Sequence, residues 1–183
     1  MDSSGSLRNN YQDEKDFLKA LAGAFGISDD GSRAGVITFS YYSEHSIKMN
    51  DHKDISSFNK AVDAIPLMGS TTRIDKALRL TQRELFSISN GARPGVNKLL
   101  ILLTDGTQTL DDGAEDPGLI TDEIRQSGIS VLVIGIGPGT NHTELKKMAG
   151  GVDNAFSAKS FDELTGGEFV SEVIKKSCEE GIS

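Results

Sequence analysis

The segment Leu99–Asp105, with the sequence LLILLTD, is the feature that most restricts the fold. Five consecutive aliphatic residues followed by polar residues and Gly106 predict a strand buried on both faces, as in a parallel sheet. The carboxylate of Asp105 would then lie at the carboxyl end of a central strand. Ligands of open α/β sheets bind at that edge, so the sequence predicts a site there.

Strand-like and helix-like segments alternate along the rest of the chain. Apolar patterns predict strands at 34–40, 42–49, 130–136 and around 155–156, and helices at 11–25, 54–65, 72–86, 117–126, 141–148 and 167–176. The order predicts one α/β domain over residues 1–183, in which three layers (α/β/α) surround a doubly wound, Rossmann-like sheet. The sheet should be mostly parallel, with 42–49 as an antiparallel edge strand.

The helix expected at 11–25 is amphipathic. Its apolar side consists of Phe17, Leu18, Leu21 and Phe25, and the charged residues expected on the opposite, solvent-facing side are Asp13, Glu14, Lys15 and Lys19. Gly26 is expected to end this helix, and Asp54 to cap the amino end of the next one.

Charge and hydropathy exclude several classes of partner. The chain has 19 Lys and Arg against 27 Asp and Glu, a net charge of −8, which disfavours nucleic acid or an anionic membrane surface. All apolar runs are far shorter than the roughly 20 residues that span a bilayer, so no membrane insertion is expected. The single cysteine, Cys178, cannot form an internal disulfide and leaves the redox compartment open.

Three segments could bring oxygen side chains to the predicted edge of the sheet. They are residues 2–6 (DSSGS), residues 69–72 (GSTT) and Asp105. Carboxylates and hydroxyls without a nearby His or Cys suit Mg²⁺, Mn²⁺ or Ca²⁺ better than zinc or copper. The candidate ligands are Asp2, Ser4, Ser6, either Thr71 or Thr72, and Asp105.

The motif Asp2-x-Ser4-x-Ser6, the segment 69–78 (GSTTRIDKAL) and the sequence LLTDG at 102–106 together resemble the von Willebrand factor type A (VWA) domain family, of the integrin, matrilin and collagen kind. The resemblance extends over essentially the whole chain. It implies the VWA fold and a metal-ion-dependent adhesion site, whose ligands would be Asp2, Ser4, Ser6, Thr72 and Asp105. Thr72 is preferred to Thr71 because family members place this threonine five residues before the small residue that is Ala77 here.

The resemblance also implies a function. The domain would be an extracellular, secreted module without enzymatic activity, which binds protein ligands in cell–matrix or matrix–matrix adhesion. Ser4 and Ser6 would hold Mg²⁺ (or Mn²⁺ or Ca²⁺) directly, and the other ligands directly or through water. Neutral hydroxyls leave much of the cation's charge uncompensated, so an open position would attract an Asp or Glu of collagen or another matrix protein.

Two other function classes stay open at this point. An intracellular VWA module that acts in complex assembly would have the same residues. A metal-dependent hydrolase or phosphotransferase would need a general acid or base beside Asp2 or Asp105, whereas His45, His52 and His142 fall in segments expected away from the edge.

One expected element is missing from the sequence. In the family the Asp-x-Ser-x-Ser loop follows a strongly apolar first strand at the centre of the sheet, but here only Met1 precedes Asp2. We therefore expect an N-terminally truncated domain. It should have a gap between the strand at 34–40 and the strand that begins at Leu99, with unpaired backbone groups on both sides.

Overall fold

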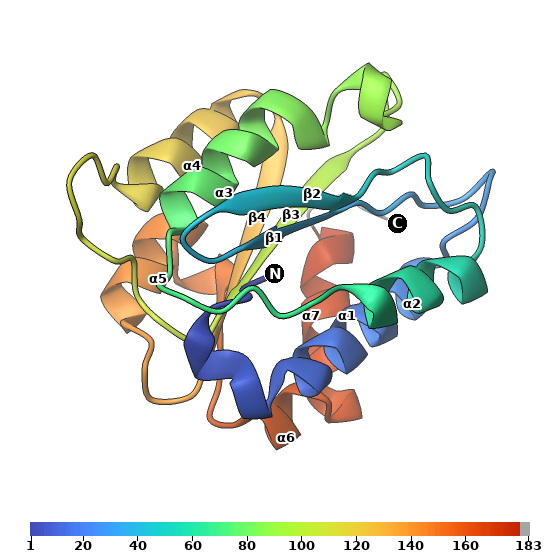
Figure 1. Cartoon of the computed structure of the whole chain (residues 1–183). Helices are drawn as coiled ribbons and strands as arrows, with labels where there is room; N and C mark the ends of the chain where they lie inside the picture. The colour runs from blue at the N-terminus through green and yellow to red at the C-terminus, as the bar shows by residue number, and fades with distance from the viewer. Residues whose placement is uncertain (180–183) are drawn as a thin grey trace.

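Helices cover both faces of a central sheet in the computed structural model, which describes residues 1–179 (Figure 1). The strands are β1 (Val36–Phe39), β2 (Ser43–Ile47), β3 (Lys98–Thr104), β4 (Ile129–Ile136) and β5 (Ala155–Ala158). β1 and β2 are antiparallel, and β3, β4 and β5 form a parallel sheet in that order. The predicted mostly parallel sheet with an antiparallel edge strand is confirmed.

The helices form the two outer layers. They are α1 (Tyr11–Phe25), α2 (Ile55–Ala64), α3 (Ile74–Leu80), α4 (Pro117–Gln126), α5 (His142–Ala149), α6 (Phe161–Leu164) and α7 (Gly167–Glu179). Side chains of α3, α4 and α5 form one core with the sheet, and those of α1, α6 and α7 form another on the opposite face. A third cluster joins α2 and α1 to the β1–β2 pair. The three-layer arrangement follows from the alternation of strands and helices.

β4 is buried at seven of its eight positions, and its side chains contribute to the core on both sides of the sheet. Val131 and Val133 belong to the cluster with α4 and α5, and Leu132 and Ile134 to the cluster with α1 and α7. Successive side chains of a strand point to opposite faces, so a continuous apolar sequence is required when helices cover both.

Several expected helix boundaries have a local cause. Asp54 caps α2 by accepting a hydrogen bond from the Ser57 N–H, and Gly26 ends α1 in the left-handed conformation. The helix expected at 72–86 is shorter: α3 begins at Ile74 and continues after Leu80 as a turn of π-helix. The residues before Ile74 instead belong to the loop described below.

The expected solvent exposure of Glu14 and Lys15 is wrong. Both side chains are buried, Glu14 completely, although they lie on the charged side of the sequence pattern. Glu14 Oε1 accepts a hydrogen bond from the Asp2 N–H (2.9 Å), and Lys15 Nζ donates to the Asp63 carbonyl (2.9 Å). The amino-terminal segment and α2 cover this side of α1, so tertiary contacts override the helical pattern.

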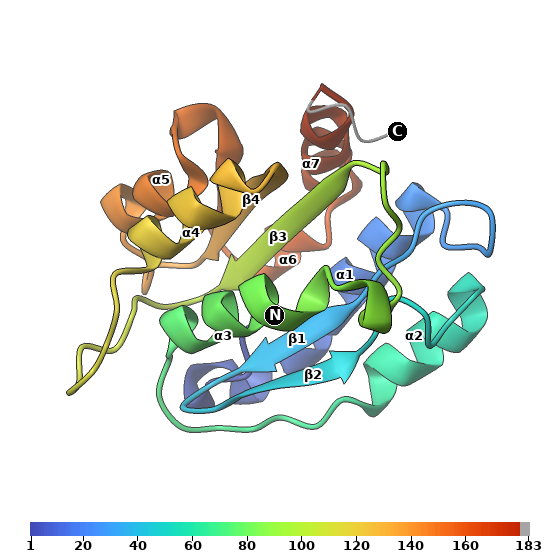
Figure 2. The ribbon, with the colours of Figure 1, turned by 90° about the horizontal axis from the view of Figure 1, so that it is seen from above.

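The expected gap in the sheet is present. β1 and β3 are edge strands of separate sheets, and within residues 1–179 only the segment Met1–Ser3 bonds to both. The amino terminus lies between these strands in Figure 2. Behind it a groove of about 770 Å³ extends between β1 and β3. N-terminal truncation stays a prediction.

Candidate metal centre

Asp2 is fixed at the carboxyl edge of the sheet by backbone and side-chain hydrogen bonds. Its N–H donates to the Leu103 carbonyl (3.1 Å), and it forms a parallel bridge with Phe39. Its carboxylate accepts from the Thr104 hydroxyl (2.7 Å) and from the Ser4 N–H (2.9 Å). The side chain is completely buried, so its orientation is determined by β1 and β3 together.

Ser4, Ser6 and Asp105 form a continuous chain of hydrogen bonds. The hydroxyls of Ser4 and Ser6 are 3.0 Å apart, and Ser6 donates to Asp105 Oδ1 at 2.9 Å. Ser4 is buried, Asp105 is half-buried and Ser6 is exposed. The structure thus brings four of the five predicted ligands into one cluster that opens to solvent at Ser6.

Thr72 lies on a neighbouring loop that is bonded to the loop after β3. The Thr72 N–H donates to the Thr109 hydroxyl (3.2 Å), and the Thr109 N–H donates to the Thr72 carbonyl (2.8 Å). A Cβ placed on Gly106, the residue after Asp105, would lie 3.6 Å from Thr72 Oγ1. Thr72 is therefore directed toward the Asp105 loop, whereas Thr71 is exposed.

The Thr72 loop is also bonded to the loop that carries the serines. The Gly5 N–H donates to the Ser70 carbonyl, and the Gly69 N–H to the Ser3 carbonyl, both at 2.9 Å. Ser70 has a φ of 78°, a left-handed conformation that is uncommon for a residue with a Cβ. Such a conformation persists only where surrounding bonds enforce it, so these two bonds hold the loop in its turn.

A buried ionic network lies directly behind Thr72. Arg73 donates two hydrogen bonds to the Asp75 carboxylate (2.8 and 2.7 Å) and one to Asp111 (2.5 Å). Gln108 donates to Asp75 at 2.7 Å. Burial alone would raise the pKa of Asp75, but these bonds outweigh it and hold the pKa far below its ordinary value. The network ties the Thr72 loop to the loop after Asp105.

The centre carries negative charge that forms no ion pair with a Lys or Arg of residues 1–179. Burial raises the pKa of Asp2, and the charge of Asp105 adds to this effect, against the bonds from Thr104 and Ser4. Burial also raises the pKa of Asp105. Among the ion pairs of residues 1–179, none joins a Lys or Arg to either carboxylate. A bound cation would remove this penalty.

The donor set fits a hard divalent cation. Two carboxylates and two hydroxyls form the cluster, and Thr72 lies on the neighbouring loop. Within the described chain no three His, Cys, Asp or Glu side chains cluster as a metal site. Hydroxyl and carboxylate oxygens are ligands that Mg²⁺, Mn²⁺ and Ca²⁺ accept. The carboxylates of Asp2 and Asp105 would hold the cation together with Ser4, Ser6 and Thr72.

The sequence reasoning missed residues that support the centre. Thr104 and Glu14 bond to Asp2, and the Arg73 network fixes the Thr72 loop. Gly139, in the loop after β4, is packed so closely that a Cβ there would lie 2.5 Å from the Asp105 carbonyl oxygen. The glycines around Pro138 were visible in the sequence, but the packing partner of Gly139 lies just after β3, and no local pattern reveals it.

Comparison with known proteins identifies the family. Residues 1–171 match the family model described as von Willebrand factor type A domain. The chain belongs to this family, and the resemblance seen in the sequence motifs is confirmed.

The relatives are much longer proteins of the extracellular matrix class. The chain is 30% identical over 169 residues to von Willebrand factor A domain-containing protein 2 of Xenopus laevis, covering 92% of this chain and 20% of that protein. It is 32% identical over 165 residues to the human collagen alpha-6(VI) chain, covering 90% of this chain and 7% of that one. The chain thus spans a small part of these relatives. Because they are extracellular matrix proteins, the expected extracellular location is confirmed.

Solved structures share the fold. Proximal thread matrix protein 1 from the mussel byssus superposes with a TM-score of 0.90 and 29% identity, over 97% of this chain and 46% of that one. Another structure of that protein, with a zinc-occupied MIDAS (metal-ion-dependent adhesion site) motif, gives a TM-score of 0.88 and 28% identity, over the same shares of the two chains. Manganese-loaded Plasmodium vivax TRAP protein has a TM-score of 0.74 and 22% identity, over 96% of this chain and 70% of that one. This similarity shows the fold alone.

We predict that Gly139→Ala lowers the affinity of the centre for Mn²⁺ by about tenfold or more, because the added methyl group must displace the Asp105 backbone. Calorimetric titration measures the affinity, and circular dichroism checks the fold. Gly23→Ala is the control, since a Cβ at Gly23 meets nothing within 4 Å. Equal Mn²⁺ affinity in both variants would contradict the assigned contact.

We predict that Arg73→Met lowers the free energy of unfolding by about 3 kcal/mol, because it leaves the buried Asp75 carboxylate without its cation. Urea unfolding followed by circular dichroism measures the change. Adding Asp75→Asn to the same variant should restore part of the stability, since the uncompensated charge is then removed. Surface substitutions usually change the free energy of unfolding by less than about 0.5 kcal/mol. An Arg73→Met variant within that range of the parent would show that the Arg73–Asp75 pair does not stabilise the fold.

Proposed function

We propose that the centre formed by Asp2, Ser4, Ser6, Thr72 and Asp105 binds Mg²⁺ or Mn²⁺ and thereby an acidic side chain of an extracellular matrix protein. The observation that supports this most strongly is the solvent-open chain of hydroxyls that ends on Asp105. Further support comes from the similar byssus matrix protein, whose MIDAS motif is occupied by zinc.

The residues of the centre have distinct tasks. The Thr104 hydroxyl and the Ser4 N–H hold the Asp2 carboxylate in a fixed orientation. Asp2 therefore forms the buried side of the site. Ser6 and Asp105 lie on the solvent side of the site, from which a ligand would approach. A bound divalent cation supplies positive charge that neutral hydroxyls do not cancel, and this attracts a partner's carboxylate.

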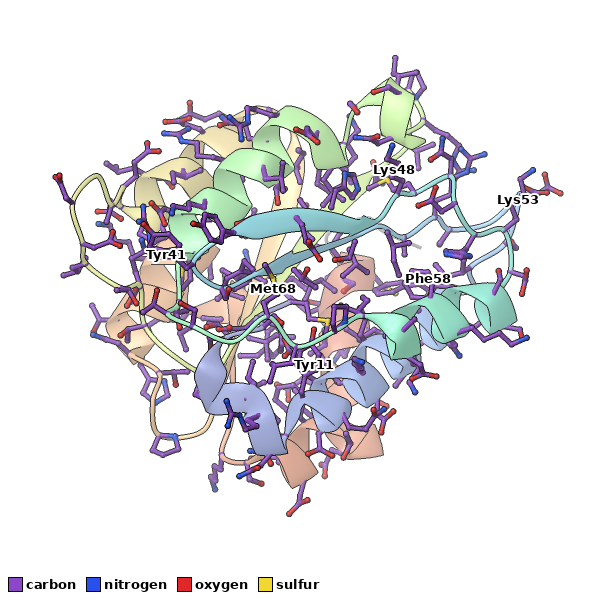
Figure 3. The ribbon with its side chains drawn as sticks, viewed as in Figure 1. Tyr11, Tyr41, Lys48, Lys53, Phe58 and Met68 are labelled. Carbon is purple, nitrogen blue, oxygen red and sulfur yellow. The ribbon has the colours of Figure 1, made fainter. Side chains whose placement is uncertain are left out.

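Exposed apolar side chains flank Thr72 and would contact the rest of the partner. Ser40 at the end of β1 accepts a hydrogen bond from the Arg73 N–H, and the following Tyr42 is 69% exposed. On the other side, Leu110 follows Thr109 and is 87% exposed. Figure 3 shows Tyr41 at the same end of the β1–β2 pair, beside α3. Exposed aromatic and aliphatic groups around a charged centre are typical of a protein-binding surface.

Binding rather than catalysis fits the positions of the histidines. His45 lies on β2, His52 packs against Phe58 and His142 contacts Ser157. Within residues 1–179 none of them forms a hydrogen bond with Asp2 or Asp105. A hydrolase would need a general acid or base at that position. No helix in the same part of the chain is long and apolar enough to cross a membrane.

Removal of the outer carboxylate tests the cation site. We expect Asp105→Ala to abolish Mg²⁺ and Mn²⁺ binding in calorimetric titration while the circular dichroism spectrum is preserved, because Asp105 is only half-buried. Asp112→Ala, which removes an exposed carboxylate from the acidic loop at 111–116, is the matched control and should bind both ions normally. Unchanged affinity in Asp105→Ala would exclude the proposed centre.

Adhesion to a surface coated with collagen or with a matrix extract tests the ligand class. We expect binding in Mg²⁺, none in EDTA, and a loss of at least tenfold in Thr72→Ala, because the partner's carboxylate needs the cation. Esterification of the carboxylates on the coated protein should have the same effect as EDTA. Adhesion that persists in EDTA would instead indicate a metal-independent surface.

A further inference from the structure

One modification motif of the sequence lies outside the metal centre. Asn141-His142-Thr143 fits the pattern Asn-x-Thr in which x is not proline, the acceptor sequence for an N-linked glycan. No other asparagine of the 183 residues is followed two positions later by Ser or Thr. The motif has a meaning only in a chain that passes through the secretory pathway, and the extracellular location of the domain meets that condition.

The side-chain amide of Asn141 uses its oxygen for the fold and leaves its nitrogen available. Oδ1 accepts hydrogen bonds from the Thr143 N–H (2.9 Å) and the Glu144 N–H (3.4 Å), and so caps the amino end of α5. Within residues 1–179 these are the only hydrogen bonds of this side chain. Asn141, His142 and Thr143 are all exposed. A glycan would be attached to Nδ2, so the folded domain can carry it without losing the cap on α5.

The loop that carries Asn141 is held in place at the carboxyl end of β4. The Gly137 N–H donates to the Ala158 carbonyl at 2.8 Å, which joins the start of the loop to the end of β5. The Thr140 hydroxyl donates to the Gly137 carbonyl at 3.1 Å and closes the turn. Asn141 follows directly and begins α5. A glycan on this side chain would therefore extend from a fixed position on the domain.

This loop lies beside the loop that carries Asp105. A Cβ placed on Gly139 would lie 2.5 Å from the Asp105 carbonyl oxygen. On the other side of Asn141, Glu144 Oε1 accepts a hydrogen bond from the Gln108 N–H at 3.1 Å. Gly139 and Asn141 are two residues apart, a length of chain that extends at most about 7 Å. Figure 1 shows the loops after β3 and β4 together on the left of the molecule. A glycan on Asn141 would therefore border the metal centre.

We propose that Asn141 carries an N-linked oligosaccharide, which shields the side of the metal centre next to α5. The donor is an oligosaccharide linked to a lipid diphosphate, as the secretory pathway supplies it. Nδ2 of Asn141 forms a bond to the anomeric carbon of the first sugar and loses one proton. The bond between that carbon and the diphosphate oxygen breaks, and the lipid diphosphate leaves with the electron pair. The transfer needs no oxidant or reductant.

The glycan would also restrict the direction from which a partner reaches the centre, and this step rests on the proposed function. β4 and α5 lie on one side of β3, whereas the β1–β2 pair is joined to its other side through Met1–Ser3. Tyr42 lies in the turn between β1 and β2. An oligosaccharide on Asn141 would cover the α5 side and leave the Tyr42 side open, so a matrix protein would contact the centre from Tyr42.

The first test measures the modification on the full 183-residue chain, secreted by cultured animal cells behind a cleavable signal peptide. Thr143→Ala removes the acceptor pattern and Thr143→Ser keeps it, while both keep Asn141 and the backbone N–H that it caps. A peptide N-glycosidase releases the glycan and converts Asn141 to Asp, which the peptide mass reveals. We expect this conversion in the parent and in Thr143→Ser but not in Thr143→Ala. An unmodified Asn141 in the secreted parent would overturn the proposal, whether or not the centre binds metal.

The second test locates the glycan, in a chain whose own cysteine is removed by Cys178→Ser. Pro138→Cys places a thiol in the exposed loop before Asn141, and Tyr42→Cys is the matched control on the other side of the centre. The rate of reaction with a maleimide on a long polyethylene glycol chain is divided by the rate with a small maleimide. We expect the glycan to lower this ratio about threefold or more at position 138 and to leave it unchanged at position 42, relative to the same proteins with Thr143→Ala. Equal ratios at position 138 with and without the glycan would overturn the shielding.

Discussion

The backbone pairing of Met1–Ser3 with β1 and β3 is the constraint on which the sheet and the metal centre both depend. These three residues join the antiparallel pair to the parallel sheet by hydrogen bonds, and the same bonds place the Asp2 carboxylate at the carboxyl edge. Within residues 1–179, no other backbone hydrogen bond joins β1 or β2 to β3. Structure and function thus share one short segment.

The chemistry of the centre follows from which groups are charged and which are neutral. Asp2 and Asp105 are the only predicted ligands with a charge, and Ser4, Ser6 and Thr72 add oxygen without adding more. Such a set holds a divalent cation but leaves it electrophilic, which suits recognition of a carboxylate. The ionic network of Arg73 then fixes the loops without contributing to the ligand charge.

The fold was predictable because its strongest signals are local. The apolar sequences of β3 and β4 could be read without any knowledge of their partners, and the end of β3 placed Asp105 at the edge of the sheet. The burial of Glu14 and the packing of Gly139 against Asp105 were not predictable, because each depends on a segment far away in the sequence. The same applies to Arg73, whose charge looks like that of any surface arginine until its partners are known.

A crystal structure grown with Mn²⁺ and measured at the manganese absorption edge tests the central claim most directly. The account predicts one strong anomalous peak among Ser4, Ser6 and Asp105, with the Ser6 hydroxyl no longer donating to Asp105 as it does in the present structure. A peak in the acidic loop at 111–116 instead, or no peak at saturating Mn²⁺, would contradict it.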